Sequence, residues 1–228
     1  MTALASVRRL TKDDVARYRA LRLRAFQESA SSFSESFEDE VNQPIEYFQR
    51  VMMMRCDDGD GDGDGDGNND SQEHFTLGAF ATAMAAASHP PVSTAVSLSA
   101  PVAGRVPGSV AGSGSGSQED EPVLIGIATF KRDGRSKARH KGYIHTMFVA
   151  PEHRGCGIGQ SILRQLIEQA RSLDGLEQMH LWVLQPHTSA ARRMYERVGF
   201  VMQGTVVCRD LKIGGVYVDA AYMSLGFS

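Results

Sequence analysis

The stretch from Arg154 to Gly159 combines residue types that could bind an anion. It reads Arg-Gly-Cys-Gly-Ile-Gly, and it lies between an apolar run at 143–149, typical of a strand, and an amphipathic run at 158–173, typical of a helix. The first turn of a helix leaves backbone N–H groups unpaired at the positive end of the helix dipole. The glycines let a ligand approach this backbone, and Arg154 adds a positive charge. Several consecutive amides around one concavity favour a diphosphate over a single phosphate.

Two common diphosphate-binding turns do not fit this stretch. A Walker A loop needs Lys followed by Ser or Thr after its last glycine, whereas Gln160 and Ser161 follow here. A dinucleotide-binding turn has the spacing G-x-G-x-x-G, which the glycines at 155, 157 and 159 do not show. The pattern that remains is R-x-x-G-x-G.

This pattern resembles the central motif of the GCN5-related N-acetyltransferase superfamily, in which the turn holds the pyrophosphate of coenzyme A. Residues 142–159 resemble its strand-turn-helix core throughout. Residues 190–200 are similar to its A-x-x-x-Y-x-x-x-G-F segment, and residues 215–223 to its closing strand. The resemblance implies an acyl-CoA N-acyltransferase fold, with acetyl-CoA as the donor substrate bound between splayed central strands.

The resemblance also implies which residues contact the cofactor. They lie at the end of the strand, in the turn and first helical positions, and at position 188, where Thr takes the place of an Asn common in the family. These residues are Met147, Phe148, Val149, Arg154, Gly155, Cys156, Gly157, Ile158, Gly159, Gln160 and Thr188.

Acetyl transfer to an amine needs a neutral nucleophile, stabilisation of the tetrahedral oxyanion and a proton for the departing thiolate. The resemblance makes Tyr195 the general acid, and a phenol suits a thiolate leaving group. A backbone N–H near Phe148 or Val149 is expected to meet the oxyanion. Tyr143 and His145 lie two residues apart on one strand face, and either of them, or a relay of water, is a candidate base.

The expected reaction is direct attack of a primary amine on acetyl-CoA in a ternary complex, because no cysteine nucleophile is evident. The alternatives are a non-catalytic CoA-binding regulatory module and an interaction scaffold on the same fold. Protein N-termini, lysine, polyamines and small amines all remain open as acceptors. Acidic residues between 35 and 40, Glu35 and Glu38 among them, could attract a cationic amine.

A chain of 228 residues is expected to form one domain over 1–228, with low-complexity insertions at 57–73 and 81–121 that cannot enter a core. Strands are expected at 5–9, 74–80, 123–130, 143–149, 179–184, 205–211 and 216–225, and the last two form a hairpin around Gly214 and Gly215. Helices are expected from Thr11, from about Pro44, over 158–173 and over 189–198. This order predicts an α/β (α+β) fold, a mixed and mostly antiparallel sheet flanked by helices.

The bulk composition argues against several classes of protein. A net charge of −3 gives no general attraction to nucleic acid or to an anionic membrane, and no apolar run is long enough to span one. The N-terminus lacks the apolar stretch of a signal peptide, so a cytoplasmic or nuclear protein is expected, as monomer or homodimer. The three cysteines and seven histidines show no metal-ligand spacing. The Asp-Gly repeat ending at Glu73 matches a calcium-loop expression, but without the expected helices, so no metal is predicted.

Overall fold

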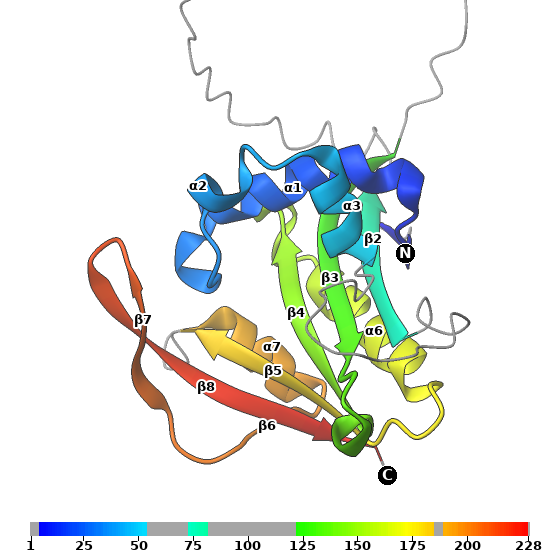
Figure 1. Cartoon of the computed structure of the whole chain (residues 1–228), viewed down its shortest axis with the longest axis vertical. Helices are drawn as coiled ribbons and strands as arrows, with labels where there is room; N and C mark the ends of the chain where they lie inside the picture. The colour runs from blue at the N-terminus through cyan, green and yellow to red at the C-terminus, as the bar shows by residue number, and fades with distance from the viewer. Residues whose placement is uncertain (1–4, 54–72, 82–121, 185–188, 228) are drawn as a thin grey trace, which may run out of the picture.

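The computed structural model describes residues 5–53, 73–81, 122–184 and 189–227 (Figure 1). Nearly all of 57–73 and 81–121 lies outside these ranges, so the insertions and the domain bounds stay predictions. Glu73 and Ala81 are the exceptions, and Ala81 belongs to a strand and pairs with Val123.

The described strands form one eight-stranded sheet in the order β1-β2-β3-β4-β5-β8-β6, with β7 paired to β8. Neighbouring strands are antiparallel except β4 and β5, which confirms the predicted mixed, mostly antiparallel sheet. The strands are β1 (Ser6–Arg9), β2 (His74–Ala81), β3 (Val123–Arg132), β4 (Lys141–Val149), β5 (Gln178–Leu184), β6 (Val201–Met202), β7 (Val207–Ile213) and β8 (Val216–Gly226).

The helices lie where the apolar spacing predicts them, with one addition. They are α1 (Val15–Glu28), α2 (Phe37–Glu40), α3 (Ile45–Met53), α6 (Ile158–Arg171) and α7 (Ala190–Arg197), with short 3-10 turns η1 (Lys12–Asp14), η2 (Ala30–Ser32), η3 (Ser136–Ala138) and η4 (Pro151–His153). The addition is α2, whose first turn is capped by Ser36. None of the described helices is long and apolar enough to cross a membrane.

Two hydrophobic cores cover opposite faces of the sheet (Figure 1). On one face, here called the α6 face, α6 buries Ile162, Leu163 and Leu166 completely against β2, β3 and β4. Burial of each such side chain contributes about 1.5–3 kcal/mol. On the other face, the α1 face, α1 and α3 pack on β3 and β2. The cores fix the relative positions of the helices and the central strands.

Strand β4 has a bulge at His145, which sequence patterning did not reveal. Thr129 on β3 pairs with Thr146, but the next residue, Phe130, pairs with Ile144, so His145 has no partner there. A bulge of this kind bends its strand and increases the local twist. The parallel pairing of β4 with β5 covers only 141–143 and 178–180, and the strands diverge beyond it (Figure 1). Their facing edges are left without backbone pairing to each other.

A buried ion pair joins α1 to α2 beside this bulge. Both oxygens of the Glu40 carboxylate accept hydrogen bonds from Arg22, at 2.7 and 2.6 Å, and both side chains are almost fully buried. Arg22 also donates to the hydroxyl of Thr146 on β4, at 3.1 Å. Tyr47 donates to Glu40 at 3.0 Å. Glu40 is one of the acidic residues between 35 and 40 that the sequence suggested for attracting the amine, and its burial in this pair corrects that expectation.

Glu40→Gln should therefore destabilise the fold. Losing the carboxylate leaves the Arg22 charge buried and unpaired, which costs about 3–5 kcal/mol of unfolding free energy. Glu28→Gln is the matched control, because Glu28 pairs with Arg24 at the surface and such pairs contribute at most about 1 kcal/mol. Urea denaturation of both variants measures the difference. If both variants lose the same unfolding free energy, the buried pair has no special structural role.

Candidate functional site

The turn between β4 and α6 has the backbone that an anion site requires. Gly155 and Gly157 have φ of +78° and +80°, in the left-handed region that residues with a Cβ rarely adopt. A Cβ placed on either residue would meet nothing within 4 Å, so the space above the turn is open. The two glycines thus provide both the curvature of the turn and room for a ligand.

The first turn of α6 supplies the backbone hydrogen-bond donors of this site. Gly157 is the N-cap, and no side chain caps the helix. The first intrahelical bond at this end runs from Ser161 N–H to the Gly157 carbonyl, at 3.0 Å. The N–H groups of Ile158, Gly159 and Gln160 precede it and have no carbonyl within the helix to bond. The predicted residues 158–160 therefore present backbone donors at the start of α6, and the exposed Cys156 is a residue of the turn before them.

Arg154 has a more definite position than the sequence indicated. Its Nε donates to the Val149 carbonyl at 2.8 Å, and its Nη2 donates to the Ser29 hydroxyl at 3.1 Å. The guanidinium also lies over the Phe148 ring, 5.4 Å from its centroid. Arg154 thus ties the end of β4 to the end of α1 while placing its charge beside the turn.

The edge of β4 that faces β5 supplies further backbone donors. The Ala150 N–H bonds the Ile125 carbonyl on the β3 side, at 2.9 Å. Because successive residues of a strand alternate, Phe148 also directs its N–H toward β3, whereas Met147 and Val149 direct theirs toward the divergence. Of the two residues expected near the oxyanion, Val149 is the one whose N–H is available. Phe148 is buried and contributes its ring to the α1-face core instead.

Gly159 allows α6 and α7 to approach β4 closely. A Cβ at this position would come within 3.0 Å of the Met194 sulfur and 3.4 Å of Met147 Cε. Met147 and Val149 pack their side chains on the α6-face core, so only their backbone is free for a ligand. The contact through Met194 places α7, which carries Tyr195, against the turn.

Tyr195, the predicted general acid, is buried. Its ring lies edge-on to Phe200, with 5.9 Å between centroids, in the core shared with α6. Burial raises the pKa of its phenol. The hydroxyl therefore stays protonated at neutral pH, as a general acid requires. Its role in proton transfer remains a prediction, and Thr188, the predicted contact to the cofactor arm, lies outside the described residues.

The two candidate bases lie beside each other on β4, with 6.2 Å between ring centroids. The Tyr143 hydroxyl is engaged by the Asp133 carboxylate. The His145 side chain is exposed at the bulge. Desolvation and then the nearby Lys131 lower the pKa of His145 from its usual 6.5, while Glu35 opposes the shift. His145 is therefore neutral at pH 7 and can accept a proton.

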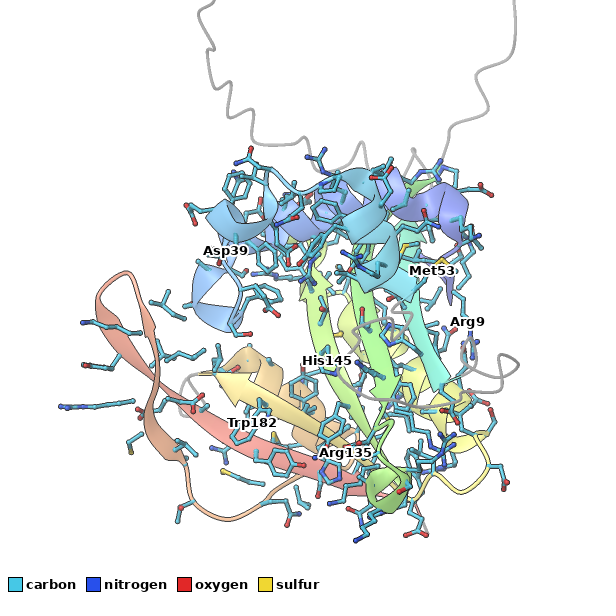
Figure 2. The ribbon with its side chains drawn as sticks, viewed as in Figure 1. Arg9, Asp39, Met53, Arg135, His145 and Trp182 are labelled. Carbon is cyan, nitrogen blue, oxygen red and sulfur yellow. The ribbon has the colours of Figure 1, made fainter. Side chains whose placement is uncertain are left out.

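A row of aromatic rings on the α1 face was not foreseen from the sequence. It runs from Tyr143 on β4 through His180 and Trp182 on β5 to Tyr222 on β8. His180 and Tyr222 are stacked 5.1 Å apart at 6°, and the centroids of Trp182 and Tyr222 are 4.9 Å apart. Figure 2 shows His145 and Trp182 on the two strands that flank the divergence. Alternation along 178–184 is the signal that could have found the row, since His180 and Trp182 share a face.

The acidic residues between 35 and 40 have different roles. Asp39 bonds the Ser36 hydroxyl at the start of α2, at 2.6 Å, and Glu40 is in the buried pair. Glu35 and Glu38 are exposed, and only the charge of Glu35 acts on His145. Glu73, the last residue of the calcium-loop pattern, instead pairs with Arg132 and Arg139. Within the described ranges, no group of three or more His, Cys, Asp or Glu side chains could hold a metal ion, and the metal prediction is otherwise untested.

Comparisons with known proteins agree with this geometry. The model of the acetyltransferase (GNAT) family matches residues 107–200. The L-amino acid N-acyltransferase MnaT of Escherichia coli is 28% identical over 110 residues, which are 47% of this chain and 60% of the relative. The L-methionine sulfoximine/L-methionine sulfone acetyltransferase of Salmonella typhimurium is also 28% identical, over 47% of this chain and 61% of its own length. The match thus spans about three fifths of these curated relatives.

Solved structures share the fold across nearly the whole chain. A phosphinothricin acetyltransferase of the GNAT superfamily from Sinorhizobium meliloti, in complex with acetyl-CoA, superposes with a TM-score of 0.63 at 14% identity. The superposition covers 99% of this chain and 89% of the other. At this identity the likeness concerns the fold, and it confirms the predicted fold class.

Gly157→Ala tests the turn as an anion site. The substitution forces Ala into a left-handed conformation that costs about 1–2 kcal/mol, and it places a methyl group in the open space. Isothermal titration should show acetyl-CoA binding at least about tenfold weaker, equivalent to 1.4 kcal/mol.

Gly204→Ala is the control for backbone strain. Gly204 has φ of +74°, with nothing within 4 Å of its Cβ position, but it lies between β6 and β7. It should lower the melting temperature as Gly157→Ala does and leave binding unchanged. Equal binding by all three proteins would show that the turn holds no ligand.

Proposed function

We propose that the chain is a member of the acetyltransferase (GNAT) family, whose model matches residues 107–200, and that it transfers an acetyl group from acetyl-CoA to a primary amine. The observation that carries the proposal is the alignment of two sets of free backbone donors, at the first turn of α6 and along the open edge of β4. A diphosphate fits the first set. The amide groups of an extended pantetheine arm fit the second, as an added strand would. The acetyl-CoA bound to the structural relative supports this choice of donor.

The proposed reaction is direct attack within a ternary complex. The neutral amine attacks the thioester carbonyl, and the oxyanion that forms accepts a hydrogen bond from Val149 N–H. The amine nitrogen releases a proton to His145, directly or through water. The intermediate then collapses, the C–S bond breaks, and the thiolate takes the Tyr195 proton to give coenzyme A and the N-acetylated product.

Two other arrangements are less well supported by the geometry. Tyr143 as the base would first have to leave the Asp133 carboxylate. Cys156 as an acetyl carrier would have to act from the pyrophosphate turn, seven residues beyond Val149 at the oxyanion position. The family resemblance and the neutral His145 favour His145 and direct transfer.

Release of coenzyme A tests the proposed function. The purified protein is mixed with acetyl-CoA and a panel of amines: amino acids, amino acid amides, polyamines and peptides with free N-termini. Thiol release above the amine-free rate, with mass spectrometry of an acetylated product, is expected. Binding of acetyl-CoA without turnover on any amine would instead indicate a non-catalytic CoA-binding module.

His145→Gln should change the pH profile as well as the rate. With His145 as base, kcat/KM falls as pH drops below about 6.5, through the lowered pKa, because the imidazolium cannot accept a proton. The variant should lose about 100-fold in kcat and also lose this acidic limb. If the variant keeps the acidic limb of the kcat/KM profile, that limb reports another group, such as the acceptor amine.

Tyr195→Phe should separate catalysis from binding. The ring still packs on Phe200, so acetyl-CoA affinity should stay within about twofold, while kcat falls by about 100-fold for loss of the general acid. Titration and steady-state kinetics on the same preparation measure both. A kcat equal to that of the unmodified protein would reduce Tyr195 to a packing residue.

A further inference from the structure

Lys131 is a cation whose charge acts on His145. It takes part in none of the ion pairs found among the described residues. Its neighbours differ in this respect, because Arg132 pairs with Glu73 and Arg135 with Asp133. Strand β3 extends to Arg132, so Lys131 is a strand residue.

The sheet register shows where Lys131 lies. It is directly opposite Tyr143 on β4 and, on its other side, His74 on β2. Thr129, two residues earlier on β3, bonds Thr76 on the α1 face at 2.9 Å, so Lys131 is on that face too. Directly opposed residues have Cβ atoms about 4.5–5.5 Å apart, which places the Lys131 stem against Tyr143.

The aromatic row begins on the other side of Tyr143. His180 pairs with Tyr143 across the parallel ladder, and Trp182 follows it on the same face of β5. The Trp182 side chain is 55% exposed, a large aromatic surface that the fold does not cover. Stacking gives aromatic pairs about 0.5–1.5 kcal/mol beyond the area they bury. The row therefore offers an aromatic surface on the opposite side of Tyr143 from Lys131.

We infer that the acceptor is a free α-amino acid with an aromatic side chain, its carboxylate bound by Lys131 and its ring packed on Trp182 and Tyr222. This inference rests on the proposed function and names the substrate class of that same site. The three groups around the α-carbon match the arrangement: the amine lies by His145, the carboxylate toward β3 and the side chain toward β5 and β8. A peptide N-terminus lacks the carboxylate at this distance, and a polyamine would place positive charge next to Lys131.

The charges that face this position are consistent with a zwitterion. Glu35 is exposed and its charge reaches His145, so it can attract the ammonium form before the proton is lost. The Arg22 and Asp133 charges on this face are already neutralised by Glu40 and Arg135. Desolvation lowers the pKa of His180, so the aromatic row carries no positive charge at pH 7. Of the described cations whose charge acts on His145, Arg22 is paired with Glu40, which leaves Lys131 to bind a carboxylate.

Steady-state kinetics with three acceptors test the inference. L-phenylalanine, L-phenylalaninamide and L-alanine are compared at saturating acetyl-CoA and fixed pH and ionic strength. Lys131→Gln should lower the kcat/KM ratio of phenylalanine to phenylalaninamide by at least about tenfold, since a hydrogen bond to a charged group contributes about 1.5–3 kcal/mol. L-phenylalaninamide keeps the amine and the ring of phenylalanine but lacks the carboxylate. Its amine differs in pKa, and this difference cancels when the kcat/KM ratio of one protein variant is compared with that of another.

A second variant tests the contact between Trp182 and the side chain of the acceptor. Trp182→Ala should lower the kcat/KM ratio of phenylalanine to alanine by about tenfold and leave the phenylalanine-to-phenylalaninamide ratio unchanged. Lys137→Gln, the same charge change in the exposed β3–β4 connection, should alter neither ratio. Acetyl-CoA titration and thermal melting confirm that all variants fold and bind the donor.

The possible outcomes are distinct. If Lys131→Gln leaves the carboxylate ratio unchanged, or if peptides are acetylated and free amino acids are not, the inferred acceptor is wrong while acetyl transfer stands. If no amine in the panel releases coenzyme A, the proposed function fails and the inference fails with it.

Discussion

The divergence of β4 from β5 is the feature on which the rest of the site depends. A continuous ladder would satisfy the backbone donors of β4 and leave nothing for a cofactor to bond. The bulge at His145 bends β4 just after its last pair with β5 and at the same point presents an imidazole at the surface. One local irregularity therefore opens the binding edge and positions the candidate base.

An opening in the middle of a sheet needs support on both sides. The Arg22–Glu40 pair and its bond to Thr146 hold α1 and α2 against β4 next to the bulge. Arg154 joins the end of β4 to Ser29 at the other end of the open edge. Of these polar contacts, the bond from Arg154 to the Val149 carbonyl occupies a backbone acceptor at the end of β4. The α6-face core, continuous from β2 to β8, keeps the two halves of the sheet in one body.

The two faces of the open region offer different chemistry. On the α6 face, Gly159 of α6 lets that helix lie close to Met194 of α7 and to Met147 of β4, and Tyr195 lies in the core. Toward α1 the strands present Lys131, His145 and the aromatic row. In the proposed reaction, backbone groups, which vary little with sequence, would hold the acetyl-CoA, and side chains would recognise the acceptor. This division explains why the resemblance identified the donor and was silent on the acceptor.

The local patterns determined the elements and the glycine turn between β4 and α6. Apolar spacing located α6 and its buried face, and glycines at 155, 157 and 214–215 marked turns whose positive φ the structure confirms. Period-two alternation failed where it met the bulge, since a single unpaired residue leaves no trace in composition or spacing. It could not show that Arg22 and Glu40 meet, 18 residues apart, or that rings from three strands form one row. Those depend on register and on the way helices pack across a face, so only the tertiary structure decided them.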